Sequence, residues 1–331
     1  MEYRRMGASG LPLSALALGT WTTLGARLGH GEARELVARA WDLGVHLFDT
    51  AESYACGEAE KVLGDVLADL RLPRDGFCVV SKAFHGSVPE PRPTQRGLSR
   101  KHLIDACHAT LRRLRLDYLD LFLCHRDDPE VPLEEILLTM DLLVRQGKVL
   151  YWGTSGWPAT RVGEACRMAR SRGLVGPSLV QERYSLLDRR AVELEAMPLA
   201  TEHGIGLTTH SPLAGGLLSG RHLDGIPADS RLAHPDHARL AASLWGEQPE
   251  RRREQVRAFV RCAAELGHSP VQLAIAWCLR QPRVCSVVVG AATPAQVEHA
   301  VGALALSRDL GEQAFERLQG CFAEAGACKQ A

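Results

Sequence analysis

G-V-H-L-F-D-T-A-E-S-Y, residues 44–54, is the stretch that decides the fold. A short apolar run ends there in Asp49, and Tyr54 follows in the next loop. Two further apolar runs also end in an ionisable side chain, Lys82 in one and His125 in the other. In parallel α/β sheets, functional groups collect at the carboxyl ends of the strands. We therefore expect these four side chains to converge on one mouth.

Apolar, strand-like runs alternate with helical stretches along the chain. The helical stretches place apolar side chains 3.6 residues apart, as at Leu103, Cys107, Leu111 and Leu114. Eight such alternations predict a closed (β/α)8 TIM barrel, in a single domain over residues 1–331. The string G-x-G-x-x-G, which marks a dinucleotide-binding open sheet, does not occur. The expected strands lie near 15–19, 46–49, 77–82, 119–124, 149–154, 178–181, 206–209 and 285–289.

The charge balance argues against two kinds of partner. Lys and Arg number 39, Asp and Glu also number 39, and the formal net charge is zero. Nucleic acid and anionic membrane surfaces both attract clustered positive charge, so we expect neither as a partner. The densest basic run, Arg251–Arg253, lies between Glu250 and Glu254. Such a run is typical of a solvated helix face.

Cysteine usage and the amino terminus bear on the compartment. The ten cysteines include no C-x-x-C pair, which fits neither a disulfide framework nor a zinc site. The amino terminus M-E-Y-R-R-M-G lacks the apolar core of a signal peptide, and no run is long enough to span a membrane. We expect a cytoplasmic protein with reduced thiols. We expect no metal, because the string H-P-D-H at 234–237 lacks a third ligand at suitable spacing.

One segment departs from the alternating pattern. From Ser211 to about Glu250 the chain is rich in Gly, Pro, Asp and His and shows no clear periodicity. The sequence therefore predicts a long loop after the seventh strand. Loops of that length in compact domains are usually functional or disordered. The tail after about Gly326 is expected to fray.

Asp, Tyr, Lys and His in this order and context resemble the tetrad of the aldo-keto reductases. From Tyr3 to about Leu310 the chain is similar to the branch that contains the voltage-gated potassium channel beta subunits. The resemblance implies a hairpin over residues 3–14 that closes the barrel bottom, and an extra C-terminal helix. The matching segments are L-A-L-G-T-W at 16–21, R-G-L-S-R-K at 96–101, Y-W-G-T-S at 151–155, S-P-L-A at 211–214, L-A-I-A-W-C-L-R at 273–280 and V-G-A-A-T-P-A-Q at 289–296.

The four residues suit the reduction of an aldehyde or ketone. A free phenol has a pKa of about 10, and we expect Lys82, held by Asp49, to lower the pKa of Tyr54. Tyr54 would then act as general acid on the alkoxide, and His125 would donate a hydrogen bond to the carbonyl oxygen. These side chains supply no hydride, so a nicotinamide cofactor is implied. The resemblance implies NADPH, with NADH as the other candidate.

His125 also separates two classes of function. In the channel beta subunits the corresponding position resembles Asn in a string such as A-N-R-P-D, whereas C-H-R-D-D stands here. A retained His favours an NADPH-dependent reductase with a small-molecule carbonyl substrate. The alternative is a nicotinamide-binding regulatory or redox-sensing subunit with slow turnover.

The resemblance carries the cofactor contacts over residue by residue. Ser155 and Gln181 match positions that hold the nicotinamide carboxamide, and His210 takes the place of an aromatic residue that stacks on the ring. The loop from Ser211, with Arg221, would wrap the pyrophosphate. The full set implied around the cofactor is Gly19, Thr20, Trp21, Asp49, Ser155, Gln181, His210, Ser211, Pro212, Leu213, Arg221, Arg231, Gly290 and Gln296.

The adenosine end departs most from the family pattern. Thr293 and Pro294 are expected as N-cap and first residue of the last barrel helix, whose dipole favours a 2′-phosphate. The relatives' phosphate-binding Ser corresponds to Ala292, and their Glu-Asn pair corresponds to residues 299–300. We therefore predict a weakened preference for NADPH, with Arg231 as a compensating contact.

Aromatic side chains dominate the expected substrate pocket and would suit a hydrophobic or aromatic aldehyde. The pocket residues are Trp21, Tyr54, Phe84, His125 and Trp157. Substrate loops vary freely on one scaffold, so the sequence does not name the carbonyl compound. The oligomeric state is open as well. Because relatives of this branch form tetramers, a homo-oligomer is one option.

Overall fold

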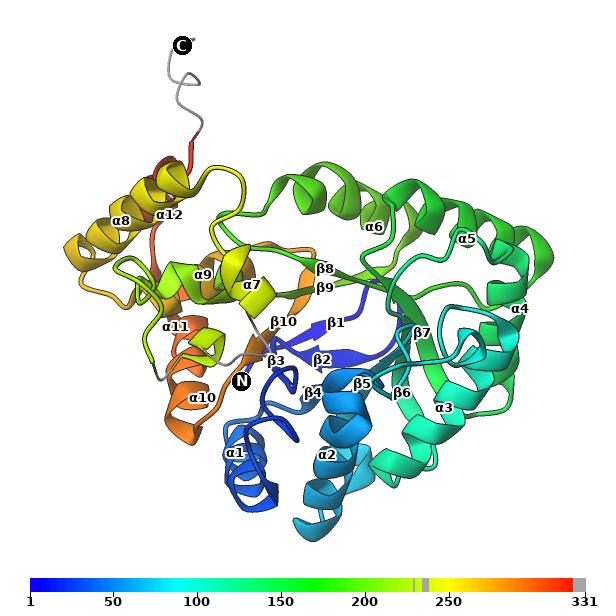
Figure 1. Cartoon of the computed structure of the whole chain (residues 1–331). Helices are drawn as coiled ribbons and strands as arrows, with labels where there is room; N and C mark the ends of the chain where they lie inside the picture. Colours follow the sequence, from blue (N-terminus) through cyan, green and yellow to red (C-terminus); the bar gives the residue numbers. More distant parts are fainter. Residues whose placement is uncertain (229, 234–237, 324–331) are drawn as a thin grey trace.

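Eight parallel strands close into a barrel in the order β10-β3-β4-β5-β6-β7-β8-β9, and helices surround it (Figure 1). The computed structural model describes residues 1–228, 230–233 and 238–323. Every predicted strand is present, with boundaries within two residues of those expected. The predicted (β/α)8 barrel is confirmed. The strands are β3 (Leu16–Gly19), β4 (Leu47–Asp49), β5 (Cys78–Ala83), β6 (Leu119–Cys124), β7 (Val149–Ser155), β8 (Leu179–Arg183), β9 (Gly206–His210) and β10 (Val284–Gly290).

The barrel strands are apolar on both faces, because one face packs in the barrel interior and the other packs under the helices. All six side chains of β6 are buried. Leu121 and Leu123 point inward and pack with Val80 of β5, whereas Phe122 and Cys124 belong to the layer under the helices. Side chains of a strand alternate between its faces, so one run serves both layers.

The helices form the outer layer of the barrel, and most of them bury one face (Figure 1). An exception is α9, which is buried on all sides from Leu273 to Leu279. The apolar spacing predicted for one of them lies in α3 (Arg100–Leu114), where Leu103, Cys107, Leu111 and Leu114 are all buried. The other helices of the described residues are α1 (His30–Asp42), α2 (Glu58–Asp69), α4 (Leu133–Arg145), α5 (Ala159–Arg172), α6 (Met197–His203), α7 (Ala238–Ala242), α8 (Pro249–Glu265), α9 (Pro270–Leu279), α10 (Pro294–Val301), α11 (Ala303–Asp309) and α12 (Glu312–Gly320).

An antiparallel hairpin of β1 (Tyr3–Arg5) and β2 (Pro12–Ser14) closes the amino-terminal end of the barrel. Met6 and Leu13 are fully buried in the same cluster as the inward-facing barrel residues. Gly7 has a φ of +56°, and a Cβ on it would stand 2.4 Å from the carbonyl oxygen of Gly204. Only glycine fits this close approach. The predicted hairpin is confirmed.

The segment after β9 is more ordered than its composition suggested. It contains the short helices η5 (Ala214–Ser219) and η6 (Arg231–Ala233), followed by α7 and α8. Leu217, Leu218 and Leu244 are buried against the barrel layer. The prediction of one long loop is therefore wrong in its extent, because scattered leucines anchor single turns without helical periodicity. Residues 234–237 and the tail after Gly326 lie outside the described residues.

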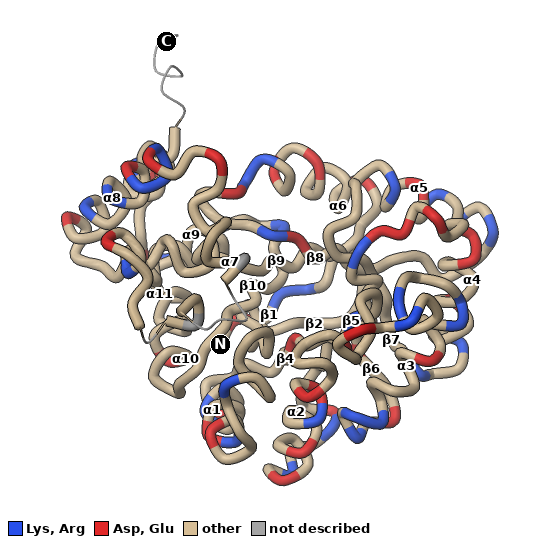
Figure 2. The backbone as a smooth tube through the Cα atoms, in the orientation of Figure 1, with Lys and Arg blue, Asp and Glu red and all other residues tan. Residues whose placement is uncertain are grey.

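Lys and Arg positions are interspersed with Asp and Glu positions along the outer helices in this view (Figure 2). In the run Arg251–Arg253, which lies on α8, Arg253 pairs with Glu250 and Arg252 lies 3.6 Å from Asp188. Arg251 donates to Gln248 over 3.0 Å. These local partners support a solvated helix face. None of the helices in the described part of the chain combines the length and apolar character that a membrane crossing requires.

Candidate active site

The parallel register brings the expected site positions to one end of the barrel. Gly19 pairs with Asp49 on one side and with Gly290 on the other. Ser155 pairs with Gln181 across β7 and β8. Four of these residues end their strands, and Gln181 lies two residues before the end of β8. Side chains that point inward there form the mouth of a TIM barrel.

Lys82 lies at the centre of the site and is fully buried. Its Nζ donates to Oδ1 of Asp49 over 2.6 Å, to the carbonyl oxygen of Thr50 over 2.9 Å and to the hydroxyl of Tyr54 over 3.4 Å. A buried ammonium is costly unless it is paired and hydrogen-bonded, and here three oxygens surround it. The structure thus brings Lys82 of β5 together with Asp49 at the end of β4 and with Tyr54 in the turn that follows.

A strained turn holds Tyr54 in this position. The short helix η1 (Tyr54–Gly57) contains Ala55 and Cys56 with φ of 49° and 54°, and Gly57 follows with φ of 88°. Left-handed backbone at residues other than glycine costs energy and persists only where the surroundings require it. The turn bends the chain sharply and fixes the phenol beside Lys82.

The electrostatics of the Tyr54–Lys82 pair differ from the sequence-based expectation. Burial raises the pKa of Tyr54, and the nearby Lys82 charge offsets this only in part. Lys82 thus lowers the pKa of Tyr54 as predicted, but the expected net decrease is wrong, because desolvation outweighs the ammonium. Burial alone would lower the pKa of Lys82, but the charges of Asp49 and Tyr54 outweigh it and raise that pKa.

His125 closes the other side of the phenol. Its ring meets that of Tyr54 edge-on, with centroids 5.9 Å apart, and only 8% of the residue is exposed. Burial, with the charges of Lys82 and Arg126, holds the pKa of His125 well below its usual value. The imidazole is therefore neutral. Its Nδ1 is buried and has no hydrogen-bond partner among the described residues.

Gln181 links the expected carboxamide contact to the acid–base group. Its Nε2 donates to Oδ2 of Asp49 over 2.8 Å, which leaves the amide oxygen Oε1 as an acceptor. The Ser155 hydroxyl stands in the neighbouring strand. A hydroxyl and an amide oxygen match the acceptor and donor of a carboxamide. Nothing lies within 4 Å of the place where a Cβ on Gly290 would stand, so there is room at the mouth.

The position expected to stack on the nicotinamide belongs to His210 at the end of β9. Burial lowers the pKa of His210 to about 3, so the ring is neutral. Its Nδ1 lies 3.0 Å from the hydroxyl of Ser211, whose φ is 59°. In the following loop the N–H groups of Ala214 and Gly216 already bond the carbonyl oxygens of Ser211 and Leu213. Those two groups would have to exchange partners to reach a phosphate.

The remaining cofactor positions are spread along neighbouring loops. Thr20 is fully buried and its hydroxyl has no partner in the described part of the chain, whereas Trp21 is 44% exposed. Arg221 is exposed after η5. Pro212 and Leu213 lead from β9 into η5. The side chain of Arg231 lies outside the described residues.

The amino end of α10 has the predicted cap. The side chain of Thr293 accepts from the N–H of Gln296, and Pro294 is the first helical residue. Oε1 of Gln296 accepts from the N–H of Ala292 over 2.7 Å. His299, farther along the helix, bonds the hydroxyl of Ser269 over 2.8 Å. Gln296 is thus folded back onto its own loop.

Two expected pocket residues differ in their access to the mouth. Phe84 is half-buried, and its ring packs edge-on against His85, which in turn meets His125. Trp157 is 5% exposed, and its Nε1 is buried without a partner among the described residues. Trp157 therefore packs into the wall of the mouth.

Sequence reasoning missed the group that holds the loop after β5. Oε1 of the buried Glu52 accepts from the N–H groups of Phe84 and Gly86 over 2.8 and 2.9 Å. His102 of α3 lies 3.1 Å from the same oxygen. This carboxylate fixes the position of Phe84. A signal was present, since Glu52 stands between Asp49 and Tyr54 in the opening stretch.

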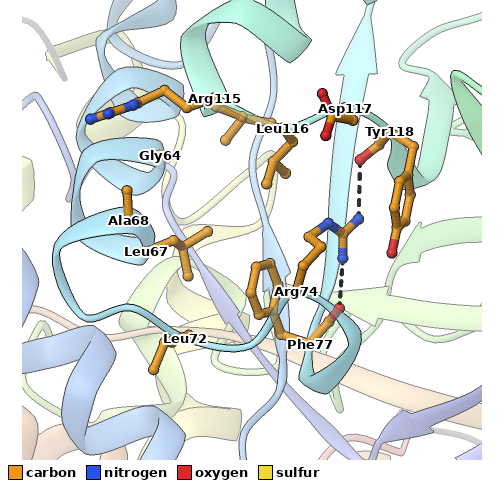
Figure 3. A pocket seen from close by; sticks show the side chains of 11 residues that line it. Gly64, Leu67, Ala68, Leu72, Arg74, Phe77, Arg115, Leu116, Asp117 and Tyr118 are labelled. Atoms are coloured by element: carbon orange, nitrogen blue, oxygen red, sulfur yellow. Dashed lines mark hydrogen bonds between the residues drawn. The ribbon is translucent and has the colours of Figure 1, made fainter.

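A surface pocket of about 230 Å³ lies away from this site (Figure 3). It is lined by α2 and by the segments that lead into β5 and β6, so it faces the opposite end of the barrel. Arg74 lies in its wall and donates to the carbonyl oxygens of Phe77 and Tyr118, each over 3.0 Å. The pocket has no link to the acid–base group. No cluster of possible metal ligands occurs in the described residues.

A parallel eight-stranded barrel with an amino-terminal hairpin and these side chains at its carboxyl end has the architecture expected of a carbonyl-reducing oxidoreductase. The chain belongs to the aldo/keto reductase family, whose model matches residues 15–322. This confirms the resemblance drawn from the sequence motifs.

Two relatives are described as probable voltage-gated potassium channel beta subunits. The one from Arabidopsis thaliana is 41% identical over 299 residues, which cover 90% of this chain and 89% of the relative. The one from Oryza sativa subsp. japonica is 41% identical over 305 residues, covering 92% and 91%. The chain therefore spans nearly the whole length of both relatives.

Proposed function

We propose that the protein reduces an aldehyde or ketone to the alcohol with NADPH, with Tyr54 as general acid. The observation that carries this proposal is the position of Lys82, whose Nζ lies 2.6 Å from Asp49 and 3.4 Å from the Tyr54 hydroxyl. Membership of the aldo/keto reductase family supports an oxidoreductase.

Each of the four side chains has one task in this proposal. Tyr54 gives its phenolic proton to the substrate oxygen, and the raised pKa keeps that proton in place at neutral pH. Lys82 stabilises the phenolate that remains, because its positive charge lies beside the oxygen. Asp49 keeps Lys82 charged and oriented. The proton is later replaced from solvent.

His125 donates a hydrogen bond to the carbonyl oxygen and so stabilises the charge that develops there. A neutral imidazole carries one proton, on either Nδ1 or Nε2. Because Nδ1 is buried without a partner, a proton there would be an orphaned donor. We assign the proton to Nε2, the nitrogen that can serve the substrate.

A bound nicotinamide would supply the hydride. Ser155 and Gln181 offer the carboxamide a hydroxyl and an amide oxygen, and Gln181 keeps its bond to Asp49 while doing so. The capped amino end of α10 provides a dipole for the adenosine phosphate. The residues present therefore fit the cofactor.

A screen of NADPH oxidation against aldehydes, ketones and sugar phosphates tests the activity, and Tyr54→Phe tests the mechanism. The variant keeps the ring and removes the proton donor, so turnover should fall roughly a hundredfold, equivalent to about 3 kcal/mol. The dissociation constant of NADPH should stay within about twofold. A variant that retained more than half of its turnover, with hydride transfer limiting the rate, would contradict the assignment of Tyr54.

The second candidate is a nicotinamide-binding regulatory subunit with slow turnover. The two plant relatives, described as probable channel beta subunits, favour it. It predicts that NADPH binds tightly while no carbonyl compound in the screen is reduced in repeated cycles. Measuring NADPH binding and multiple turnovers on the same preparation separates the two candidates.

A further inference from the structure

Arg126 places a positive charge at the rim of the mouth. It follows His125 directly, is exposed, and donates from Nη1 to the carbonyl oxygen of His125 over 2.9 Å. A Cβ on Gly156, which has a φ of +63°, would stand 2.8 Å from the same nitrogen. The guanidinium group therefore lies over the loop after β7, and glycine at 156 leaves space for it.

The charge of Arg126 is not compensated, unlike the charges around it. Arg183 lies 3.0 Å from Asp188, and Arg161 lies 2.7 Å from Asp127. Lys82 is paired with Asp49. Arg126 has no ion pair within 4.0 Å in the part of the chain that the structure describes. An arginine of this kind can bind a carboxylate or phosphate with two parallel hydrogen bonds.

Glu182 interacts electrostatically with Arg126 but does not neutralise it fully. Glu182, beside Gln181 at the end of β8, accepts from the N–H of Gly156 over 3.2 Å. Burial raises the pKa of Glu182 to about 7, so a large fraction of it is uncharged at neutral pH. The charge of Arg126 also acts on groups inside the mouth, because it helps to lower the pKa of His125 and of His85.

We propose that Arg126 binds a carboxylate or phosphate carried by the carbonyl substrate, so that the protein prefers anionic aldehydes over neutral ones of the same shape. This inference rests on the proposed reductase activity and names its substrate class. It refines the sequence-based expectation of an aromatic aldehyde, because Tyr54 and Phe84 still offer flat apolar surfaces beside the charge.

The test compares matched substrates on the protein with saturating NADPH. For 4-carboxybenzaldehyde, kcat/KM should exceed that for methyl 4-formylbenzoate by about tenfold, the effect of one exposed charge-assisted contact of about 1.4 kcal/mol. Glyceraldehyde 3-phosphate against glyceraldehyde makes the same comparison for phosphate. Whichever pair shows the larger ratio identifies the anionic group.

Three variants locate the effect. Arg126→Gln should bring the acid-to-ester ratio close to one, and Arg126→Lys should keep part of it, because lysine retains the charge but not the planar fork. Arg112→Gln removes the same charge from the exposed face of α3 and should leave the ratio unchanged. A ratio near one in the unmodified protein, or a ratio that survives in Arg126→Gln, would overturn the proposal.

A binding measurement keeps this test separate from the activity itself. 4-Carbamoylbenzoate and its methyl ester resemble the two aromatic substrates, differ from each other only in the carboxylate, and carry an amide in place of the aldehyde, so they cannot be reduced in this way. Quenching of tryptophan fluorescence in the presence of NADP+ should show 4-carbamoylbenzoate binding about tenfold more tightly, and Arg126→Gln should abolish the difference. If neither aldehyde turns over but this difference is found, the reductase proposal fails while the anion site stands. Equal binding of the two compounds would contradict the proposed anion site at Arg126.

Discussion

At the scale of single residues, His125 is the side chain on which the two candidate functions differ. It is neutral, buried and in edge contact with Tyr54, so its ring can present one N–H to a substrate oxygen. An asparagine can also donate one hydrogen bond, but its amide is shorter and leaves the space beside the phenol partly empty. The residue thus affects both the direction of the hydrogen-bond donor and the packing of Tyr54, the proposed general acid.

His125→Asn should lower the single-turnover rate on a good aldehyde by at least about tenfold, because the substrate carbonyl oxygen loses the hydrogen bond from the His125 N–H. NADPH affinity should be unaffected, since the side chain lies on the substrate side of the site. Rapid mixing of enzyme, NADPH and aldehyde gives the rate, and fluorescence titration gives the affinity. Equal rates for the two forms would favour the regulatory candidate.

At the scale of an element, α10 shows how a helix end can fit a phosphate incompletely. Thr293 caps the helix and the dipole favours negative charge there. Ala292 offers no hydroxyl, and its N–H is already bonded to Oε1 of Gln296. Glu298 on the same helix pairs with Arg39 of α1 over 2.7 Å. Much of the hydrogen bonding at this end is therefore internal.

Ala292→Ser should strengthen the preference for NADPH over NADH. The new hydroxyl can donate to a 2′-phosphate, and a hydrogen bond to a charged group contributes about 1.5 to 3 kcal/mol, or roughly tenfold or more in affinity. Titration of both nucleotides by fluorescence measures the change. Ala305→Ser, on the exposed face of α11, is the matched control and should have no effect. If the unmodified protein already preferred NADPH over NADH by a thousandfold or more, another residue would have to bind the 2′-phosphate.

At the scale of the whole molecule, closure of the barrel sets the protonation of groups that are remote in sequence. Glu182 is the penultimate residue of β8, a strand that packs against the helical turn η4 (Val192–Ala196), which carries Glu195. Burial raises the pKa of Glu182 from 4.5 to about 7; the Gly156 N–H and Arg126 oppose the rise, and Glu195 adds to it. The folded protein therefore holds a proton there that the unfolded chain releases at lower pH.

The stability of the fold should consequently fall as pH rises from about 4.5 to about 7. Below this window both states are protonated, and above it both are ionised. Glu182→Gln keeps the acceptor for the Gly156 N–H and removes the titration. The melting temperature of this variant minus that of the unmodified protein should therefore increase by about 2 °C from pH 4.5 to pH 8. Glu90→Gln, in an exposed loop, controls for loss of charge. A gain that does not change with pH would contradict the linkage.

The sequence by itself determined the barrel and its strands, and it singled out the four side chains that we propose as the acid–base group. Each strand is a short apolar run with a local period, and the rule that parallel strands expose function at their carboxyl ends joins Asp49 to Lys82 without coordinates. The Thr293 cap also follows from a local pattern, whereas the hairpin was implied by the family resemblance. The sequence-based prediction failed in the segment after β9, because its buried leucines are isolated and do not recur with a helical period.

Only the tertiary structure decided how these residues act on one another. The bond from Gln181 to Asp49 spans the barrel, and Glu52 finds its partners in the loop after β5 and in α3. The pKa of Tyr54 rises because desolvation exceeds the effect of Lys82, a balance that exists only once the mouth is closed. The unpaired charge of Arg126 is likewise visible only when its neighbours are placed. Burial and distance set electrostatic energies, and a sequence contains neither.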